Sequence, residues 1–243
     1  MSTSGSYTYS IQQNSMLLSA FRLMGVFNDD SPPPATDIAN ASQALNLMIK
    51  EWMSRGYPLW TVKDVTLPLV LGQTQYLLGP ANVATPFRPL RITYGRLHYT
   101  ASGLEVPLIQ LSRQEYNMLG NKTSKGTPNS YYYDPQTTNG VLNLYLPADS
   151  YNVANTVIIT CQRPIQDMLN TGDDFDFPIE WLNAIKYGLA AELSLEYDVP
   201  PQKSQMLMVK AEKSLNSMLD WSQEEASTFF TPDSRYTHKY ASR

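Results

Sequence analysis

The sequence predicts an α+β protein with a four-helix core, an inserted, mostly antiparallel β domain, and an extended C-terminal tail. Apolar residues recur with the helical period of about 3.6 near both ends of the chain. Between residues 61 and 172 they follow the strand period of two. The prediction therefore assigns residues 1–60 and 173–225 to the helical core, 61–172 to the β domain and 226–243 to the tail.

The first helix is expected to run from about Ser10 to Met24. Gly25 follows, a residue that commonly ends helices in the left-handed conformation. One side of this helix is apolar, as a helix packed on a core requires. The residues that make up this side are Leu17, Leu18, Phe21 and Met24.

The second helix is expected to begin with Thr36 or Asp37 as its cap and to end sharply. Arg55 complements the helix dipole, Gly56 is a C-cap residue, and Pro58 prevents continuation. An abrupt end fits a chain that leaves the helices there for the β domain. The buried side is predicted to contain Ile38, Ala41, Leu45, Met48, Ile49, Trp52 and Met53.

Short alternating runs predict about six strands between the helices. Proline cannot donate to a strand ladder, so Pro68, Pro107 and Pro147 indicate edges or bulges. Ser112 is expected to cap one short helix, and Cys161 to lie in the core as a small apolar residue. The six runs are 61–70, 74–78, 90–100, 105–111, 141–147 and 155–163.

Three consecutive tyrosines, Tyr131, Tyr132 and Tyr133, could stack on bases or sugars. In an alternating strand, however, the outer two face one side and the middle one faces the other. Packing within the sheet is therefore the favoured interpretation.

The pattern returns to helix near the C-terminus. A third helix is predicted from Pro178 to about Tyr197, and a fourth from about Gln202 to Glu225. The third has its apolar side at Ile179, Leu182, Ile185, Leu189 and Leu193, and the fourth at Met208, Ala211, Leu215, Met218 and Leu219. The residues predicted to anchor the helical core are Trp52, Trp181, Leu189 and Leu215.

The tail, residues 226–243, combines aromatic and basic side chains without a helical pattern. It is either a disordered terminus or a segment that becomes ordered on a partner, since exposed aromatic residues are otherwise a liability. The residues predicted to dock on that partner are Phe229, Phe230, Arg235, Tyr236, Lys239 and Tyr240.

Composition and motifs argue against several functional classes. The 18 basic and 22 acidic residues give a net charge of −4, and no Lys/Arg cluster indicates a duplex-DNA reader. The N-terminus has no standard signal sequence, and no apolar run approaches the about 20 residues that a membrane crossing needs. The common zinc, nucleotide and hydrolase motifs are missing from the sequence, so no cofactor, metal or catalytic residue is predicted.

One acidic cluster offers an enzymatic alternative: Asp173, Asp174, Asp176 and Glu180 could supply the paired carboxylates of a cell-wall glycan hydrolase. The favoured interpretation is that these anions stabilise the N-terminus of the third helix. A carbohydrate- or receptor-binding tail module, using the β domain and its tyrosines, is a further alternative.

Several stretches resemble the head-to-tail adaptor proteins of tailed, especially short-tailed, bacteriophages. This family includes the tail tubular protein A and the packaged-DNA-stabilising accessory proteins. The resemblance covers about residues 10–225. Residues 41–60 resemble the second helix of that family, an aliphatic-rich run that ends with a tryptophan, a glycine and a second aromatic residue. The stretches are ASQALNLMIKEWMSRGYPLW, GTPNSYYYDPQTTNGVLNLYLPADS, VIITCQRPIQDM and DDFDFPIEWLNAIKYGLAAELSLEYDVP.

The resemblance implies a structural, non-enzymatic virion protein made in the host cytoplasm and located at the head–tail junction. It implies a ring, twelvefold in copy number, that docks on the portal protein and extends the DNA channel. The ring would carry the tail nozzle or a tail tubular protein B-like component. It would help retain packaged DNA, which passes without sequence-specific binding at ejection. The C-terminal segment would reach into the portal, and no membrane would be involved.

Overall fold

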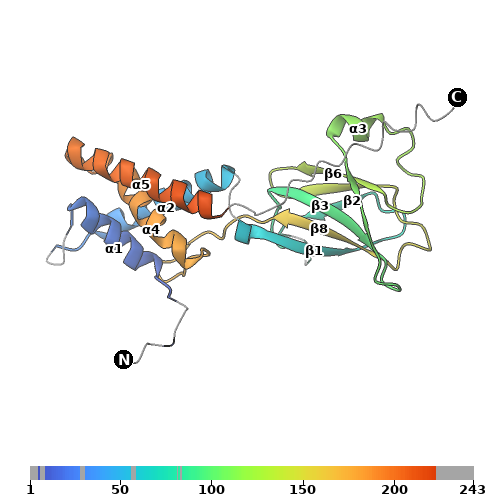
Figure 1. The fold of residues 1–243 in the computed structure, drawn as a ribbon, viewed down its shortest axis with the longest axis horizontal. Helices are drawn as coiled ribbons and strands as arrows, with labels where there is room; N and C mark the ends of the chain where they lie inside the picture. Colours follow the sequence, from blue (N-terminus) through green and yellow to red (C-terminus); the bar gives the residue numbers. More distant parts are fainter. Residues whose placement is uncertain are drawn as a thin grey trace.

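The computed structural model describes residue 5 and residues 9–27, 31–55, 59–80, 82 and 84–222. Over these residues the protein has a mixed α and β fold with five α-helices and two four-stranded sheets. A helical part and a strand-bearing part lie end to end along the long axis of the molecule (Figure 1). The predicted tail, residues 226–243, lies outside the described residues.

The strands form two sheets, in the orders β1-β8-β3-β4 and β2-β7-β6-β5. All pairs are antiparallel except β5 with β6, which confirms the mostly antiparallel prediction. The strands are β1 (Val62–Pro68), β2 (Gln75–Leu78), β3 (Arg91–His98), β4 (Glu105–Pro107), β5 (Ile109–Gln110), β6 (Ser130–Pro135), β7 (Gly140–Tyr145) and β8 (Thr156–Gln162).

Two differences from the predicted strands have simple causes. The run 105–111 is not one strand, because after Pro107 the chain leaves β4 in the first sheet and enters β5 in the second. The tyrosine run adds β6 to the six predicted strands. Pro68 and Pro107 end the edge strands β1 and β4, as expected of a residue that cannot donate to a neighbouring strand.

The two sheets enclose one buried apolar cluster, with side chains from both. Cys161 and Tyr131 lie inside it, and Tyr133 packs against its border. A Cβ at Gly95 would lie 2.7 Å from Cε1 of Tyr131, so the glycine makes room for that ring. Tyr132 faces the other way and stacks on Tyr116 at 5.6 Å between ring centroids. The predicted roles of Cys161 and the three tyrosines are confirmed.

The helical part contains α1 (Gln13–Met24), α2 (Ala35–Ser54), α4 (Leu182–Leu193) and α5 (Pro201–Trp221). A second buried cluster takes its residues mainly from α1, α2 and α4. From α5 only Leu207 joins it, so the predicted four-helix core is a three-helix core with α5 packed on the outside of α4. The two clusters share no residue.

The helix ends agree with the sequence in part. Gly25 ends α1 with a φ of 72°, as predicted. The predicted cap of α2 at Thr36 or Asp37 is wrong: the helix begins after Pro34 without a side-chain cap, and Asp37 lies inside the first turn. Arg55 follows the last turn, while Gly56 and Pro58 lie outside the described residues.

The third predicted helix is shorter than expected, and the fourth begins where it was predicted, within one residue. Pro178 precedes a 3-10 turn, η2 (Ile179–Trp181), and α4 then ends at Leu193, four residues before the predicted end at Tyr197. α5 is described to Trp221, so its predicted end at Glu225 is outside the described residues. The short helix α3 (Arg113–Met118) has its predicted cap, because Ser112 Oγ accepts a hydrogen bond from the Glu115 N–H at 3.2 Å.

Candidate functional site

The acidic cluster predicted near the third helix does not converge on a common point. Asp176 forms a two-pronged ion pair with Arg163, in which Nη2 donates to Oδ1 at 2.8 Å and Nη1 donates to Oδ2. The Asp173 carboxylate accepts the backbone N–H groups of Leu169 and Asn170 at 2.9 and 2.8 Å. Both carboxylates therefore have structural partners.

The electrostatics of these two residues do not suit glycan hydrolysis. The backbone N–H of Asn170 lowers the pKa of Asp173. Burial raises the pKa of Asp176, but hydrogen bonds from Arg163 and Gln166 outweigh it and the net pKa is lowered. A glycosidase general acid typically has a raised pKa, so the lowered pKa of both residues argues against that role. The described residues also contain no group of three or more His, Cys, Asp and Glu placed to hold a metal ion.

The interpretation of the cluster as helix N-terminal charges was also incomplete. The segment around Asp173 caps a different helix, since the carbonyls of Thr171 and Asp173 accept the N–H groups of Asn14 and Gln13 at 3.0 Å each. These are two of the orphan donors at the start of α1, which has no side-chain cap of its own. The loop before α4 thus fixes the beginning of α1.

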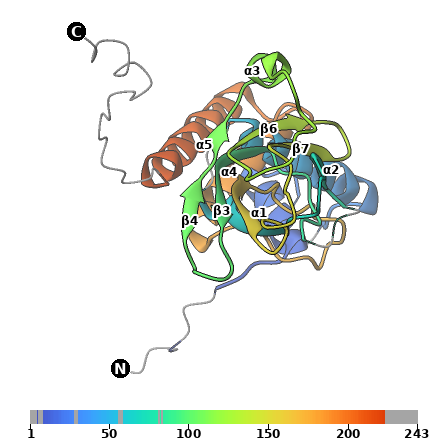
Figure 2. The ribbon, with the colours of Figure 1, turned by 90° about the vertical axis from the view of Figure 1, so that its right-hand side faces the viewer.

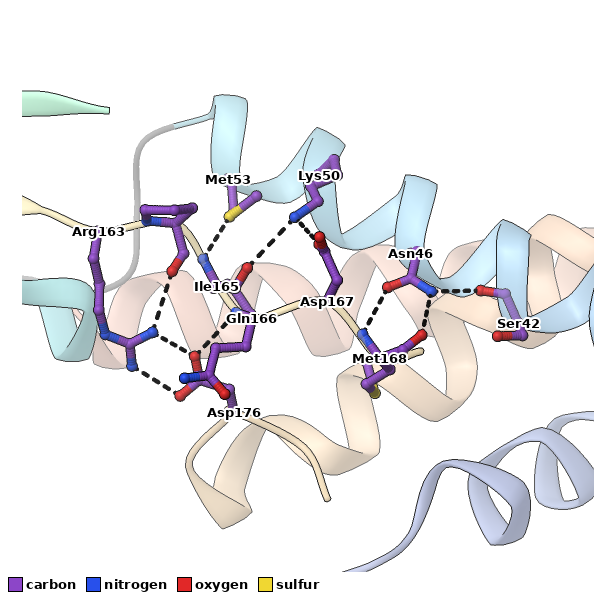
Figure 3. Close-up of polar contacts among 11 residues, drawn as sticks. Ser42, Asn46, Lys50, Met53, Arg163, Ile165, Gln166, Asp167, Met168 and Asp176 are labelled. Carbon is purple, nitrogen blue, oxygen red and sulfur yellow. Dashed lines mark hydrogen bonds and ion pairs between the residues drawn. The ribbon is translucent and has the colours of Figure 1, made fainter. Parts of the chain in front are cut away.

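Residues 163–168, here called the strap, run from β8 along the side of α2 (Figure 3). Asn46 holds the strap at Met168: its Oδ1 accepts the Met168 N–H at 3.1 Å and its Nδ2 donates to the Met168 carbonyl at 3.0 Å. The Asn46 side chain therefore makes the two hydrogen bonds to the Met168 backbone that a neighbouring strand would otherwise make. The same Nδ2 also donates to the carbonyl of Ser42 at 3.0 Å.

Two further α2 side chains hold the strap closer to the two packed sheets, here called the sandwich. Lys50 forms an ion pair with Asp167 and donates to the Ile165 carbonyl at 3.4 Å. The Ile165 N–H points at Sδ of Met53, 2.9 Å away. Ile165 and Met168 are buried in the helical cluster, so the strap packs with the helices although the predicted boundary placed it in the β domain.

An aromatic cluster of Trp52, Trp60, Phe177 and Trp181 fills the junction between α2, the chain leading into β1, and η2. The ring centroids of Trp60 and Trp181 are 4.9 Å apart, and those of Trp52 and Trp181 are 6.2 Å apart. The indole Nε1 of Trp60 donates to the Asp176 carbonyl at 3.3 Å. A space of only about 10 Å³ remains beside these rings, too little for a small-molecule ligand.

The four predicted anchors lie in or near this region. Trp181 and Leu189 are fully buried, and Trp52 is partly buried against the helical cluster. Leu215 on α5 is half-buried and faces the aromatic cluster. The predicted docking residues Phe229, Phe230, Arg235, Tyr236, Lys239 and Tyr240 lie outside the described residues.

The sequence analysis missed Asn46, Lys50 and Arg163, which hold the two parts together. A signal was present, because Ser42, Asn46 and Lys50 recur every four residues beside the apolar side of α2. Such spacing places polar side chains in one row along a helix. The row indicates a polar partner but not which segment supplies it.

The model of the SU10 adaptor protein family matches residues 16–235, which include both parts of the structure. The chain belongs to this family. The SU10 adaptor proteins are a family of phage head-to-tail adaptors, and the match supports a structural role associated with portal and tail components. A search of curated proteins finds no match.

Among the exposed surfaces of the described residues, two carry several apolar side chains and could be contact sites. One is the outer face of α5, with Met206 and Val209. The other is the far tip of the sandwich, where loops expose Leu71, Leu104 and Tyr151. Within the described residues, no helix has the length and apolar content to cross a membrane.

Proposed function

We propose that the protein forms a head-to-tail adaptor ring that docks on the portal, extends the DNA channel and carries the tail nozzle. In this role it helps retain packaged DNA and passes it at ejection. The observation that carries the proposal is the SU10 adaptor family match, which covers residues 16–235. The relationship to the tail tubular protein A group of short-tailed phages is part of the same proposal.

The joining of the two parts supports this role. A ring subunit that transmits contacts from head to tail has to hold its two ends in a fixed orientation. The strap and the aromatic cluster provide this, because the strap is bonded along α2 and Trp60 packs on Trp181. Polar and apolar contacts together restrain the junction more than a flexible linker would.

Charge supports the passage of DNA. The net charge is −4 and the sequence has no cluster of Lys and Arg. A channel wall without concentrated positive charge does not hold the phosphate backbone, so DNA slides through it. The proposal therefore includes no sequence-specific DNA contact, no enzymatic activity and no cofactor.

Each part of the chain has a place in the proposal. Residues 1–60 and 173–225 form the lateral contacts of the ring, with Trp52, Trp181, Leu189 and Leu215 keeping the helices together. Residues 61–172 face outward or toward the tail. The tail, residues 226–243, docks on the portal through its aromatic and basic side chains.

Electron microscopy of the purified protein mixed with the portal protein of the same phage tests the function directly. The expected result is a ring of additional density under the portal, with twelvefold symmetry. The chain without portal is expected to remain monomeric or weakly associated. A small closed oligomer that forms alone and leaves the portal unchanged would contradict the proposal.

A further inference from the structure

The outer face of α5 is unusually exposed for so long a helix. Of its 21 residues only Ser204 and Leu207 are buried, and Met206 and Val209 on the opposite side are 73% and 61% exposed. Lys213 lies one turn beyond Val209 on the same side. This face therefore offers two apolar side chains followed by a positive charge.

The outer face of α2 has a matching pattern with the opposite charge. Leu47 is 62% exposed and lies opposite the buried residues of this helix. Glu51 follows one turn later, and its Oε1 accepts a hydrogen bond from Arg55 at 2.5 Å. An exposed apolar residue is again followed four residues later by a charge, here a negative one.

The two faces lie on opposite sides of the helical part, with α4 between them (Figure 2). Both helices run toward the sandwich (Figure 1), so they point in the same direction. A rotation about an axis along the molecule preserves that direction. It would bring α5 of one copy parallel to α2 of the next.

Val209 and Leu47 also lie at about the same level along the helices. Next to Val209, Lys210 places its Nζ 5.5 Å from the ring centroid of Tyr187. Next to Leu47, Met48 places its Sδ 2.9 Å from where a Cβ of Gly188 would be. Tyr187 and Gly188 are neighbours on α4, so both outer residues share one level.

We propose that the outer face of α5 in one copy packs in parallel on the outer face of α2 in the next copy. Val209 then contacts Leu47, and Lys213 lies beside Glu51. This inference rests on the proposed ring and identifies its lateral contact. The interface is heterologous, so repeating it by rotation about the long axis gives a ring rather than a two-fold dimer.

Size and charge favour a second copy as the occupant. The helices have 20 and 21 residues, so each is about 30 Å long and the two match in length. The alternative occupant within the chain, the tail, carries Arg235, Lys239 and Arg243 against Asp233. Its positive charge is repelled by the lysines on α5.

Two variants that each remove one face test the proposal. Val209→Asp removes the α5 face and Leu47→Asp removes the α2 face, and each is mixed with portal and examined by native mass spectrometry. Each variant alone is expected to lose the ring. An equimolar mixture of the two variants is expected to form a heterodimer. In it, the intact α5 face of the Leu47→Asp chain packs on the intact α2 face of the Val209→Asp chain. Leu77→Asp, at a 54% exposed position in β2, is the matched control and is expected to form rings.

A cysteine pair tests the contact without adding a charge. The Leu47→Cys/Val209→Cys chain is expected to give a ladder of covalently linked copies when it is oxidised on the portal. Leu47→Cys/Leu77→Cys is expected to give none. The natural thiol does not interfere, because Cys161 is buried and burial raises its pKa to about 11.

The outcomes separate the inference from the function. If wild-type protein forms rings on the portal and the two aspartate variants still do so, or the ladder does not form, the α5–α2 contact is refuted while the adaptor function stands. If Leu47→Asp alone forms dimers, α5 pairs with α5 and the heterologous contact is refuted. If wild-type protein adds no ring to the portal, both the function and the inference fail.

Discussion

Asp176 illustrates how one side chain can serve several segments at once. Its carboxylate binds Arg163 at the start of the strap and accepts the Gln166 N–H at 3.1 Å, while its carbonyl accepts from Trp60. The sequence identified Asp176 as part of an acidic cluster. It could not identify Arg163 as the partner, because Arg163 lies 13 positions earlier and the residues between them form a loop with no regular period.

Replacing Asp176 with Asn is expected to destabilise the fold by about 2 kcal/mol at pH 7, since a charge-assisted pair is lost and Arg163 keeps its charge. The net folded-state pKa of Asp176 is lowered. Its contribution is therefore present above the unfolded value of about 3.9 and is lost as the pH falls through the folded pKa. Urea unfolding at pH 7 and below pH 4 measures the difference.

Asp174→Asn is the control for this prediction, because Asp174 is exposed and the substitution should change stability little at either pH. A difference between wild type and Asp176→Asn that is equally large at pH 7 and at pH 3 would contradict the ion-pair explanation.

At the scale of elements, α1 shows which features a sequence can reveal. Its C-terminus was predictable, because Gly25 adopts the left-handed conformation locally. Its N-terminus was not, because the capping carbonyls of Thr171 and Asp173 come from the far end of the chain. The periodic pattern located all four long helices, but it could not show that α5 would pack mainly on α4 and add only Leu207 to the buried helical cluster.

Gly25→Ala is expected to lower the free energy of unfolding by about 1–2 kcal/mol. The φ of 72° disfavours a side chain, and the new Cβ would lie 2.8 Å from Nζ of Lys203, which donates to the Met24 carbonyl at 2.8 Å. Chemical denaturation followed by circular dichroism measures the change. Gly120→Ala is the control, since a Cβ there would meet no atom within 4 Å. Equal stability of the two variants would show that the end of α1 is not strained.

At the scale of the whole molecule, the chain forms two separate buried clusters, one among the helices and one between the sheets. The alternation of periods led us to expect a helical part and a strand-bearing part, and the domain boundaries drawn from it stay a prediction. The course of the strap was not predicted, because residues 163–168 have neither a helical nor a strand period and are ordered by side chains on α2. Non-local hydrogen bonds of this kind leave little trace in a local pattern.

Deleting residues 226–243 is expected to leave the melting temperature unchanged and to abolish binding to the portal. The thermal part follows because, among the described residues, the members of both buried clusters lie at or before Leu207. Differential scanning fluorimetry and co-sedimentation with portal measure the two effects. A full-length chain with Phe229→Ser and Phe230→Ser should bind portal more weakly if the aromatic side chains carry the contact. Normal docking by the truncated chain would contradict the role of the tail.

The strap also has a mechanical consequence. It runs beside α2 rather than away from it, so a pull on the sandwich along the long axis loads the contacts of Asn46, Lys50 and Met53 in shear, all together. Bonds loaded in this way resist extension better than bonds that open one after another. Tension applied from one end of the particle would thus reach the helices without peeling the sandwich off them.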